Sequence, residues 1–507
     1  MVAPVPSVQR FSGYDALVSG TARRTILASV AALFVLGYFV LLLANTCRFA
    51  AGPDSSGYLN EARLLLSGRT AAVVEPLVAG KLDPSLIYLF TPYGFARGPE
   101  PGTMVPTYPV GTPLHLAAAA AVGGWSFAPF VVGPLAASAS LFLLVTLARR
   151  LGAGRGWAIV AAVLLAAFPV FILEAVQPVS DVLATFWALL AIVCALRAEE
   201  HWRWAVLSGV AFAIGVAVRP TNILMVLPLL AAMRFRLPRL AVAGLAALPF
   251  AVALMAYHAK LYGSPFVTGY GGAGGILSFG GAPPCAGSQA SFLASLLTPL
   301  VFPAGLLAVF SRRWNRWERA LLLTWFGVFF LFYSFYSYCP DFASTRFLLP
   351  ALPPLLAGFA RGAGELTDVI AKRSRFAGRA LAVLLVLLLV GREVQQIGRL
   401  HVLHADDWES IFPRTVETVE RQVRPDAVVL SSVLSGAFYF HAQRITVRWD
   451  QLTPETSAIL LADPRFAGPW YAVVSEVEGG ADALRARVPG EWREVARIRD
   501  VVVWQRF

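Results

Sequence analysis

Long apolar runs alternate with short polar gaps from residue 25 to residue 394. A helix needs about 20 mostly apolar residues to cross a bilayer, so these runs predict about eleven transmembrane helices. The sixth and tenth runs are short, which leaves the count open by one pair. The predicted spans are residues 25–45, 128–148, 156–174, 181–197, 203–218, 221–233, 239–258, 292–311, 319–338, 346–360 and 376–394.

The basic residues orient these helices, because Lys and Arg gather in cytoplasmic loops. Arg10, Arg23 and Arg24 precede the first run and predict a cytoplasmic N-terminus. Five later basic clusters share that side only if residues 46–127 lie entirely outside. The clusters are Arg149/Arg150/Arg155, Arg197/Arg203, Arg234/Arg236/Arg239, Arg312/Arg313/Arg316/Arg319 and Arg361/Lys372/Arg373/Arg375/Arg379. The stretch 112–124 is then a juxtamembrane helix, and everything after residue 395 is outside.

The pattern changes after residue 400. Four segments have the composition of strands, and helical spacing occurs between them, which predicts a small α/β domain. The strand-like segments are 427–432, 445–449, 470–476 and 501–507, and the helical ones are 416–423 and 454–461. We therefore expect an α-helical polytopic membrane protein in three parts. These are a cytoplasmic N-terminus (1–24), a transmembrane region (25–400) with a large first outer loop (46–127), and an extracytoplasmic α/β domain (401–507).

Composition supports this fold class. The chain is 57% hydrophobic and only 14% charged, which excludes an ordinary soluble protein. Its net charge of +12 comes without a basic stripe interleaved with aromatic residues, so we expect no nucleic-acid partner. We expect a multi-pass protein of the plasma (inner) membrane. Cys285 and Cys339 both fall outside, where they either form one bridge or stay unpaired.

Asp54 is the first candidate for chemistry, because a carboxylate at a membrane boundary is costly unless it is hydrated, paired or functional. Residues 58–66 after it are amphipathic, which predicts a helix lying in the interface. This helix would hold Asp54 at the depth of a lipid phosphate, where it can act as a general base. Alternatively, Asp54 or Ser55 caps that helix. Asp181 has the same two interpretations, at the start of the predicted helix 181–197.

Five motifs, all expected on the outer side, follow one another along the chain. They are Asp54 with its Tyr-containing helix, TYPVGTPLH at 107–115, PVSD at 178–181, YGSPFVTGY at 262–270, and RFLLP at 346–350 with Pro353 and Pro354. Together they resemble the glycosyltransferase C superfamily, in particular bacterial protein O-mannosyltransferase-like and lipid A aminoarabinose transferase-like enzymes. The resemblance covers about residues 20–360 and depends on the order and the common side of these motifs. Val110 and Gly111 stand where the family has a second proline, and Ser55 stands where many members have a second acidic residue.

The resemblance implies a membrane glycosyltransferase that moves a sugar from a polyprenyl-phosphate donor to an unknown glycan, lipid or protein acceptor outside the membrane. Asp54 would be the catalytic base, and Asp181 a second acidic residue that orients the acceptor or a cation. Tyr58, Tyr108, His115 and Tyr270 lie in the matching motifs and would bind substrate.

The donor phosphate needs a cation, and Arg suits it through its permanent charge and bidentate geometry. Arg346 is the preferred ligand, from its position and from the family motif. Arg219 and Lys260 also stand at outer ends of spans, and His258 lies close to Lys260. Each of them can instead be an interfacial residue whose charge reaches water.

We predict no bound metal and no certain cofactor, although the resemblance leaves room for a divalent cation. The cluster His401, His404, Asp406 and Asp407 matches no strong metal-binding spacing. The alternative function is a transporter or flippase of lipid-linked glycans, and a third is a structural protein of polymer assembly. Few charges fall within the predicted spans and no internal repeat is visible, which favours the transferase over a transporter.

Overall fold

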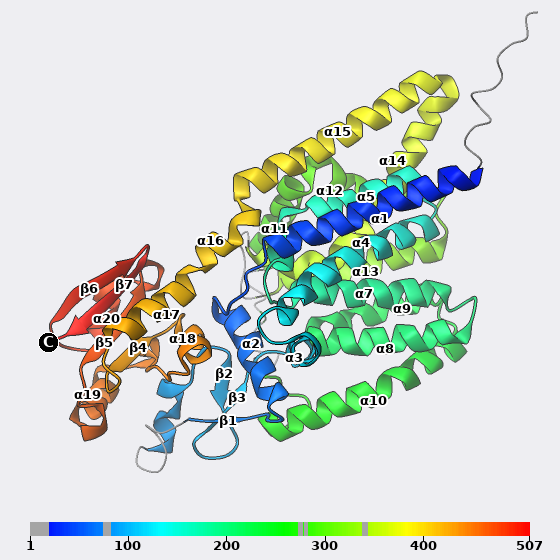
Figure 1. The fold of residues 1–507 in the computed structure, drawn as a ribbon. Helices are drawn as coiled ribbons and strands as arrows, with labels where there is room; N and C mark the ends of the chain where they lie inside the picture. The colour runs from blue at the N-terminus through cyan, green and yellow to red at the C-terminus, as the bar shows by residue number, and fades with distance from the viewer. Residues whose placement is uncertain (1–19, 75–82, 272–276, 278–281, 337–342) are drawn as a thin grey trace, which may run out of the picture.

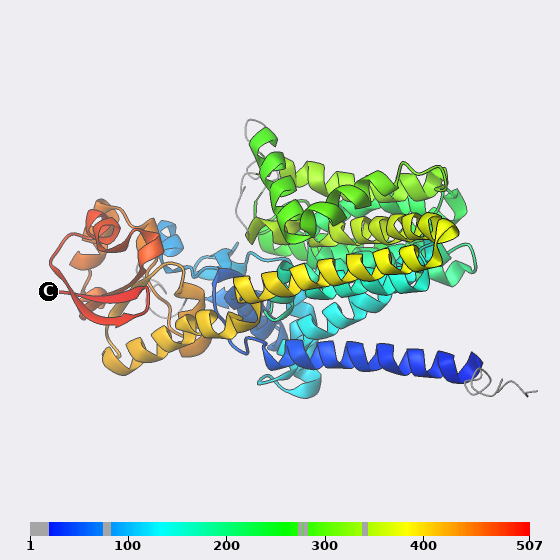
Figure 2. The same ribbon diagram turned by 90° about the horizontal axis from the view of Figure 1, so that it is seen from above.

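The fold is given by a computed structural model, which describes residues 20–74, 83–271, 277, 282–336 and 343–507. Most of the described chain is helical. The helices form an elongated bundle, and the C-terminal sheet stands beyond one end of it (Figures 1 and 2). The start of α1 (Gly20–Ala44) and the C-terminus therefore lie at opposite ends of the molecule.

Each apolar run corresponds to one helix or to two consecutive ones. In chain order these helices are α1 (Gly20–Ala44), α4 (Val132–Arg150), α5 (Arg155–Ala167), α6 (Pro169–Ala175), α7 (Asp181–Arg197), α8 (Trp202–Val218), η3 (Pro220–Met225), α9 (Val226–Ala232), α10 (Leu237–Tyr262), α11 (Ala282–Leu296), α12 (Thr298–Ala308), α13 (Arg316–Ser334), η5 (Ala343–Ala351), α14 (Leu352–Arg373) and α15 (Arg375–Leu400).

Length and composition alone mark fewer membrane crossings than the sequence pattern predicted. Within the described residues, three helices are long and apolar enough to span, at 128–150, 237–262 and 375–422. The number rises to five if two bent pairs each count as one span. Pro169 stands at the start of α6, where α5 and α6 bend by 62°, because proline cannot continue the preceding helix. The eleven crossings stay a prediction.

The first outer loop contains α2 (Pro53–Leu66), a small antiparallel sheet, and α3 (Gly111–Gly123), which is the predicted juxtamembrane helix. The sheet has the order β1-β3-β2, with η1 (Pro84–Phe90) beside it, and η2 (Ala128–Val131) follows α3. Its strands are β1 (Ala72–Val73), β2 (Phe95–Arg97) and β3 (Thr103–Pro106).

The polar side of α2 does not face water, as an exposed amphipathic helix would, while its position at the membrane interface stays a prediction. Its polar side is inside the protein, with Asn60 only 4% exposed and Glu61 fully buried. Asn60 Nδ2 donates to the Gly436 carbonyl at 3.0 Å, and Arg63 donates to the Phe440 carbonyl. These carbonyls belong to α18 (Ser435–Ala442), so protein rather than lipid headgroups satisfies the polar side of α2.

The C-terminal region is an α/β unit, as predicted. Its four-stranded sheet has the order β4-β5-β7-β6, with β4 and β5 parallel and the other pairs antiparallel. The strands are β4 (Val428–Ser431), β5 (Trp470–Ser475), β6 (Trp492–Ile498) and β7 (Val501–Arg506). The helices, besides α18, are α16 (Ala405–Glu409), α17 (Ile411–Gln422), α19 (Pro454–Ala462) and α20 (Gly480–Arg487).

One strand prediction was wrong and one strand was missed. Residues 445–449 make a single parallel bridge, between Val447 and Leu430, because the chain then turns into a short 3₁₀ helix at Trp449. β6 was not predicted, because most of its side chains are exposed and it lacks the apolar alternation of a half-buried strand.

The first outer loop and the C-terminal region share one hydrophobic core. Leu89, Phe90 and Met104 from the loop cluster with Leu430 and Trp470 from the C-terminal sheet. All five side chains are nearly or fully buried. The two segments therefore lie at the same end of the bundle.

Candidate functional site

The carboxylate of Asp54 faces the bundle instead of capping its own helix. α2 begins at Pro53 with Gly52 as its N-cap, and no side chain caps it. The Tyr108 hydroxyl donates to Asp54 Oδ1 at 2.7 Å, and Arg346 Nη2 donates to Oδ2 at 2.6 Å. The capping interpretation is thus wrong for Asp54. Ser55 does not cap the helix either, since its Oγ accepts from the Ala51 amide that precedes it, at 2.9 Å.

Gly57 allows Tyr108 to reach Asp54. A Cβ at position 57 would run into the Tyr108 ring, and Gly94, in the left-handed region at φ 90°, packs against the same point of α2. A glycine inside a helix costs about 1 kcal/mol relative to alanine. Here that cost is offset by the close approach of the tyrosine.

A second ion pair lies deeper in the bundle. Asp181 is the first residue of α7 and caps nothing, so its capping interpretation is also wrong. Its carboxylate is paired with Arg219, which stands between the end of α8 and Pro220. The Asp181 side chain is 4% exposed and that of Arg219 is 13% exposed. Residues far apart in sequence thus form a buried pair at the outer-loop end of α7 and α8.

Glu174 approaches the first of these pairs, and it was not among the predicted site residues. It lies on α6 with a side chain only 6% exposed, and its Oε2 is 4.0 Å from Arg346 Nη1. The signal was present, because Glu174 is the only charged residue in the apolar run 156–174. A buried carboxylate in such a run is rarely there for stability.

Aromatic rings line the cluster. Phe347 lies close to both arginines, with its ring centre 5.0 Å from the guanidinium carbon of Arg219 and 5.2 Å from that of Arg346. The Tyr108 ring contacts Tyr58 at 4.8 Å between centroids and Tyr270 at 6.0 Å. Tyr58 is buried, whereas Tyr270 is 50% exposed, so the tyrosines extend from the ion pairs toward the surface.

The site therefore has an accessible layer and a buried layer. The side chains of Asp54 and Arg346 are 33% and 26% exposed, while Asp181 and Glu174 are nearly inaccessible. Burial raises the pKa of the Asp54 carboxyl, but Arg346 and the Tyr108 hydroxyl outweigh it and hold the pKa below its ordinary value. Asp54 is thus a carboxylate at neutral pH.

Three predicted site residues lie outside this cluster as far as the described contacts show. Lys260 is exposed, and His258 packs beside Tyr257 and Tyr262 on its own helix. Both ring nitrogens of His115 have partners within the protein, the Gly111 carbonyl at 2.6 Å and the Trp187 indole N–H at 3.2 Å. These contacts favour a structural role for His115.

The carboxylates do not form a metal site in their present arrangement. No group of three acidic, His or Cys side chains among the described residues converges as metal ligands would. Both Asp54 oxygens accept hydrogen bonds, and Asp181 pairs with Arg219. We therefore route no step through a cation. The proposed bridge of Cys285 depends on Cys339, which lies outside the described residues.

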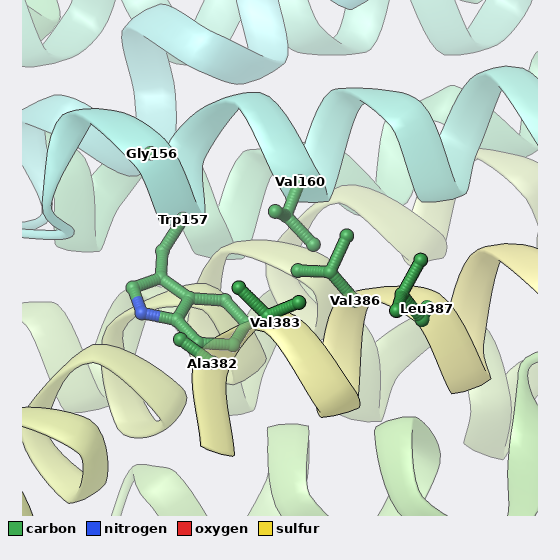
Figure 3. Close-up of a pocket in the computed structure, with 7 residues that line it drawn as sticks. All are labelled: Gly156, Trp157, Val160, Ala382, Val383, Val386 and Leu387. Carbon is green, nitrogen blue, oxygen red and sulfur yellow. The ribbon is translucent and has the colours of Figure 1, made fainter. Parts of the chain in front are cut away.

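An apolar cavity lies elsewhere, between α5 and α15 (Figure 3). It measures about 300 Å³ and is lined by Trp157, Val160, Val383, Val386 and other small or aliphatic residues. The Trp157 indole N–H donates to Thr367 Oγ1 at 3.2 Å. The side chains that line this cavity include no acid, base or cation that could transfer a proton or bind a phosphate.

A family model and several solved structures resemble this chain. The model for dolichyl-phosphate-mannose-protein mannosyltransferases matches residues 108–261. That range includes Tyr108, Asp181 and Arg219 but neither Asp54 nor Arg346. Curated proteins gave no significant sequence match.

The solved structures match over nearly the whole chain. ArnT from Cupriavidus metallidurans, bound to undecaprenyl phosphate, is 15% identical with a TM-score of 0.52, over 96% of this chain and 98% of that one. The oligosaccharyltransferase AglB from Archaeoglobus fulgidus, in complex with an inhibitory peptide and a dolichol-phosphate, is 12% identical with a TM-score of 0.55, over 92% and 72%. The mycobacterial arabinofuranosyltransferase AftD is 13% identical with a TM-score of 0.50, over 94% and 41%. The resemblance to the glycosyltransferase C superfamily is confirmed, and the chain has the fold of that superfamily.

Proposed function

We propose that this chain is a membrane glycosyltransferase that moves a sugar from a polyprenyl-phosphate donor to an acceptor hydroxyl, outside the membrane, with inversion. The observation that carries the proposal is the Asp54–Arg346 pair, which joins a base and a phosphate ligand in one partly accessible site. The similar structures support the lipid-phosphate part, since ArnT is bound to undecaprenyl phosphate and AglB to a dolichol-phosphate.

The chemistry is a single displacement. The Asp54 carboxylate takes the proton of the acceptor hydroxyl while its oxygen attacks the anomeric carbon of the donor sugar. A new carbon–oxygen bond forms on one face of the sugar as the bond to the phosphate oxygen breaks on the other. Polyprenyl phosphate leaves with the electron pair, and the Arg346 guanidinium stabilises its charge.

The ion pair in the structure implies an order of events. Asp54 and Arg346 neutralise each other at 2.6 Å, so neither is free to act. A donor phosphate would draw Arg346 away from Asp54. The Asp54 carboxylate, still partly buried, would then become a stronger base because it has lost its counter-ion. We therefore propose that the donor binds first and activates the base.

The buried groups hold this arrangement in place. Asp181 has no route to substrate at 4% exposure, so we assign it a positioning role through Arg219. Glu174 lies 4.0 Å from Nη1 of Arg346, the terminal nitrogen that Asp54 does not use, and would retain Arg346 during the exchange. Tyr58, Tyr108 and Tyr270 offer ring faces and hydroxyls near the base, as a sugar-binding wall requires.

A transporter or flippase is less well supported. Transporters place ionisable groups along a path near the middle of the membrane. Here the described Asp54, Glu174, Asp181, Arg219 and Arg346 gather at the outer-loop end of the bundle.

The direct test is a transfer assay with purified protein, labelled polyprenyl-phosphate sugars and extracted envelope acceptors. Asp54→Asn should cut turnover by a factor on the order of 10²–10⁴, the usual contribution of a general base. Asp368→Asn makes the same change at an exposed carboxylate on α14 and should leave turnover unchanged. Movement of the donor across vesicles without any transfer product would refute the proposal in favour of a flippase.

A further inference from the structure

A polar cavity lies at the other end of the helical bundle. It has a volume of about 170 Å³, where the end of α4, the turn after α7, the end of α9 and the start of α13 meet. Its polar lining is Arg150, Glu199, Arg234, Asn315, Trp317 and Glu318. α7 leads from Asp181 to this end over 17 residues, which is about 25 Å at 1.5 Å per residue. Since α7 runs along the bundle (Figure 1), the cavity at its far end is separate from the Asp54 site.

Positive charge exceeds negative charge at its rim. Arg234, Arg236 and Arg239 all approach a single oxygen of Glu199, at 3.3, 3.4 and 3.3 Å. Each guanidinium carries five N–H donors, so one carboxylate oxygen cannot satisfy three of them. Arg234 and Arg236 are also 42% and 51% exposed. The group carries two uncompensated positive charges and donors that face outward.

The backbone is strained where it presents these arginines. Arg234 and Phe235 follow the C-cap of α9 with φ angles of 53° and 54°, in the left-handed region that favours glycine. Two consecutive side chains there cost free energy, and such strain persists where the surrounding structure or function requires it. The turn holds Arg234 at the cavity and leaves Phe235 56% exposed beside it.

Apolar surface continues from the cavity along α10. Leu237 at the start of this helix is 76% exposed, and Leu245 and Leu248 further along are 68% and 53% exposed. The most apolar part of α10 has none of its residues buried in the protein. A ligand that joins an anionic group to long apolar chains fits both surfaces, whereas a free anion fits only the first.

We infer that this cavity binds the phosphate headgroup of an acidic membrane lipid, whose acyl chains lie along α10. Arg234 and Arg236 would bind the phosphate oxygens, for which paired guanidinium donors are well suited. Glu199 competes for the same donors and holds the arginines together when no lipid is bound. The site has no part in the transfer reaction, so it stands or falls independently of the proposed function.

The test is the binding of phosphatidylglycerol to the full-length protein in phosphatidylcholine nanodiscs, measured by native mass spectrometry over a titration. The double variant Arg234→Gln/Arg236→Gln should bind phosphatidylglycerol on the order of tenfold more weakly. The matched control Arg373→Gln/Arg375→Gln removes the same charge from exposed positions at the turn between α14 and α15, outside the cavity, and should bind like the wild type.

A third variant keeps the test independent of misfolding. Glu199→Gln removes the competing carboxylate, so it should bind phosphatidylglycerol severalfold more tightly than the wild type, which a damaged fold would not do. Equal losses in both double variants would show a general charge effect and overturn the site. Displacement of phosphatidylglycerol by millimolar inorganic phosphate would overturn the lipid assignment. Weaker binding in Glu199→Gln would overturn the competition on which the inference rests.

Discussion

At Asp54, burial and ion pairing act in opposite directions on one carboxyl group. Burial raises its pKa, and Arg346 with the Tyr108 hydroxyl lowers it further than burial raises it. A carboxylate whose pKa is held low by its counter-ion is a weak base, because a proton has to compete with Arg346 for the same oxygens. The resting pair thus makes sense only if substrate separates it.

The geometry at Arg346 predicts that lysine cannot replace it. Arg346 uses two nitrogens, Nη2 toward Asp54 and Nη1 toward Glu174. Lysine keeps the charge but offers one point donor in place of a planar fork. We expect Arg346→Lys to transfer sugar on the order of 10- to 100-fold more slowly at saturating donor, measured by the same assay. Wild-type turnover in Arg346→Lys would show that the fork is not needed.

Some residues of this site could be predicted from the sequence and others could not. Asp181 and Arg346 stand at the start of apolar runs and Asp54 just before an amphipathic segment, where a charge is visible in the sequence, and the structure brings all three together. Glu174 is also visible, as the one charge in the run 156–174, but its approach to Arg346 at 4.0 Å depends on the bend at Pro169 between α5 and α6. Partners that depend on such a bend cannot be read from local spacing.

Among the elements, α2 positions Asp54, and the packing of Gly57 within this helix gives a specific prediction. By helix propensity alone, Gly57→Ala should stabilise the protein. The Tyr108 ring occupies the space of the new methyl group, so the substitution should instead push Tyr108 from Asp54. We expect a lower melting temperature and at least tenfold slower transfer, a loss of about 1.4 kcal/mol.

A matched glycine serves as the control for this effect. Gly391 lies within α15, and no atom lies within 4 Å of where its Cβ would be. Gly391→Ala should therefore be neutral or slightly stabilising and should leave transfer intact. If Gly57→Ala behaved like Gly391→Ala, Tyr108 would not pack as described.

Glu61, further along α2, makes the free energy of unfolding depend on pH. Tyr257 donates to one of its oxygens at 3.0 Å, and the other oxygen is buried without a partner. Burial raises the pKa of Glu61 to about 8, from an ordinary value of 4.5. Between pH 4.5 and about 8, Glu61 is protonated in the folded state and ionised in the unfolded state. Stability therefore falls as pH rises through this window.

Glu61→Gln should remove that dependence. Glutamine accepts the same hydrogen bond from Tyr257 and has no proton to lose. Its melting temperature should match the wild type near pH 4.5, exceed it increasingly as pH rises, and reach a constant difference above pH 8. Glu100→Gln, at an exposed position of the first outer loop, is the control. A difference that does not change with pH would contradict the buried, neutral Glu61.

At the scale of the whole molecule, the shared core of the first outer loop and the C-terminal region constrains topology. Phe90 and Met104 pack with Leu430 and Trp470, so a membrane cannot separate them. Reporter fusions at residues 100 and 450 should both report an external location. Opposite locations would contradict the shared core, and two cytoplasmic signals would contradict the orientation that the basic clusters predict.

The global architecture was only partly predictable. The apolar runs correspond to helices because burial in lipid or in protein requires the same hydrophobicity, and for that reason they do not say how many cross the membrane. The polar side of α2 includes Asn60 and Arg63, and its burial depends on α18, nearly four hundred residues away. The local sequence therefore favoured an exposed helix at an interface. Contacts of this range leave no local pattern.

The most direct measurement is the affinity of the purified protein in detergent for undecaprenyl phosphate, a polyprenyl phosphate without its sugar. If the phosphate takes Arg346 from Asp54, Arg346→Ala should bind on the order of tenfold or more weakly, and Asp54→Asn should bind more tightly than the wild type. The two variants break the same ion pair, so their opposite signs separate phosphate binding from loss of the pair. Equal affinity in Arg346→Ala and the wild type, or weaker binding in Asp54→Asn, would contradict the account.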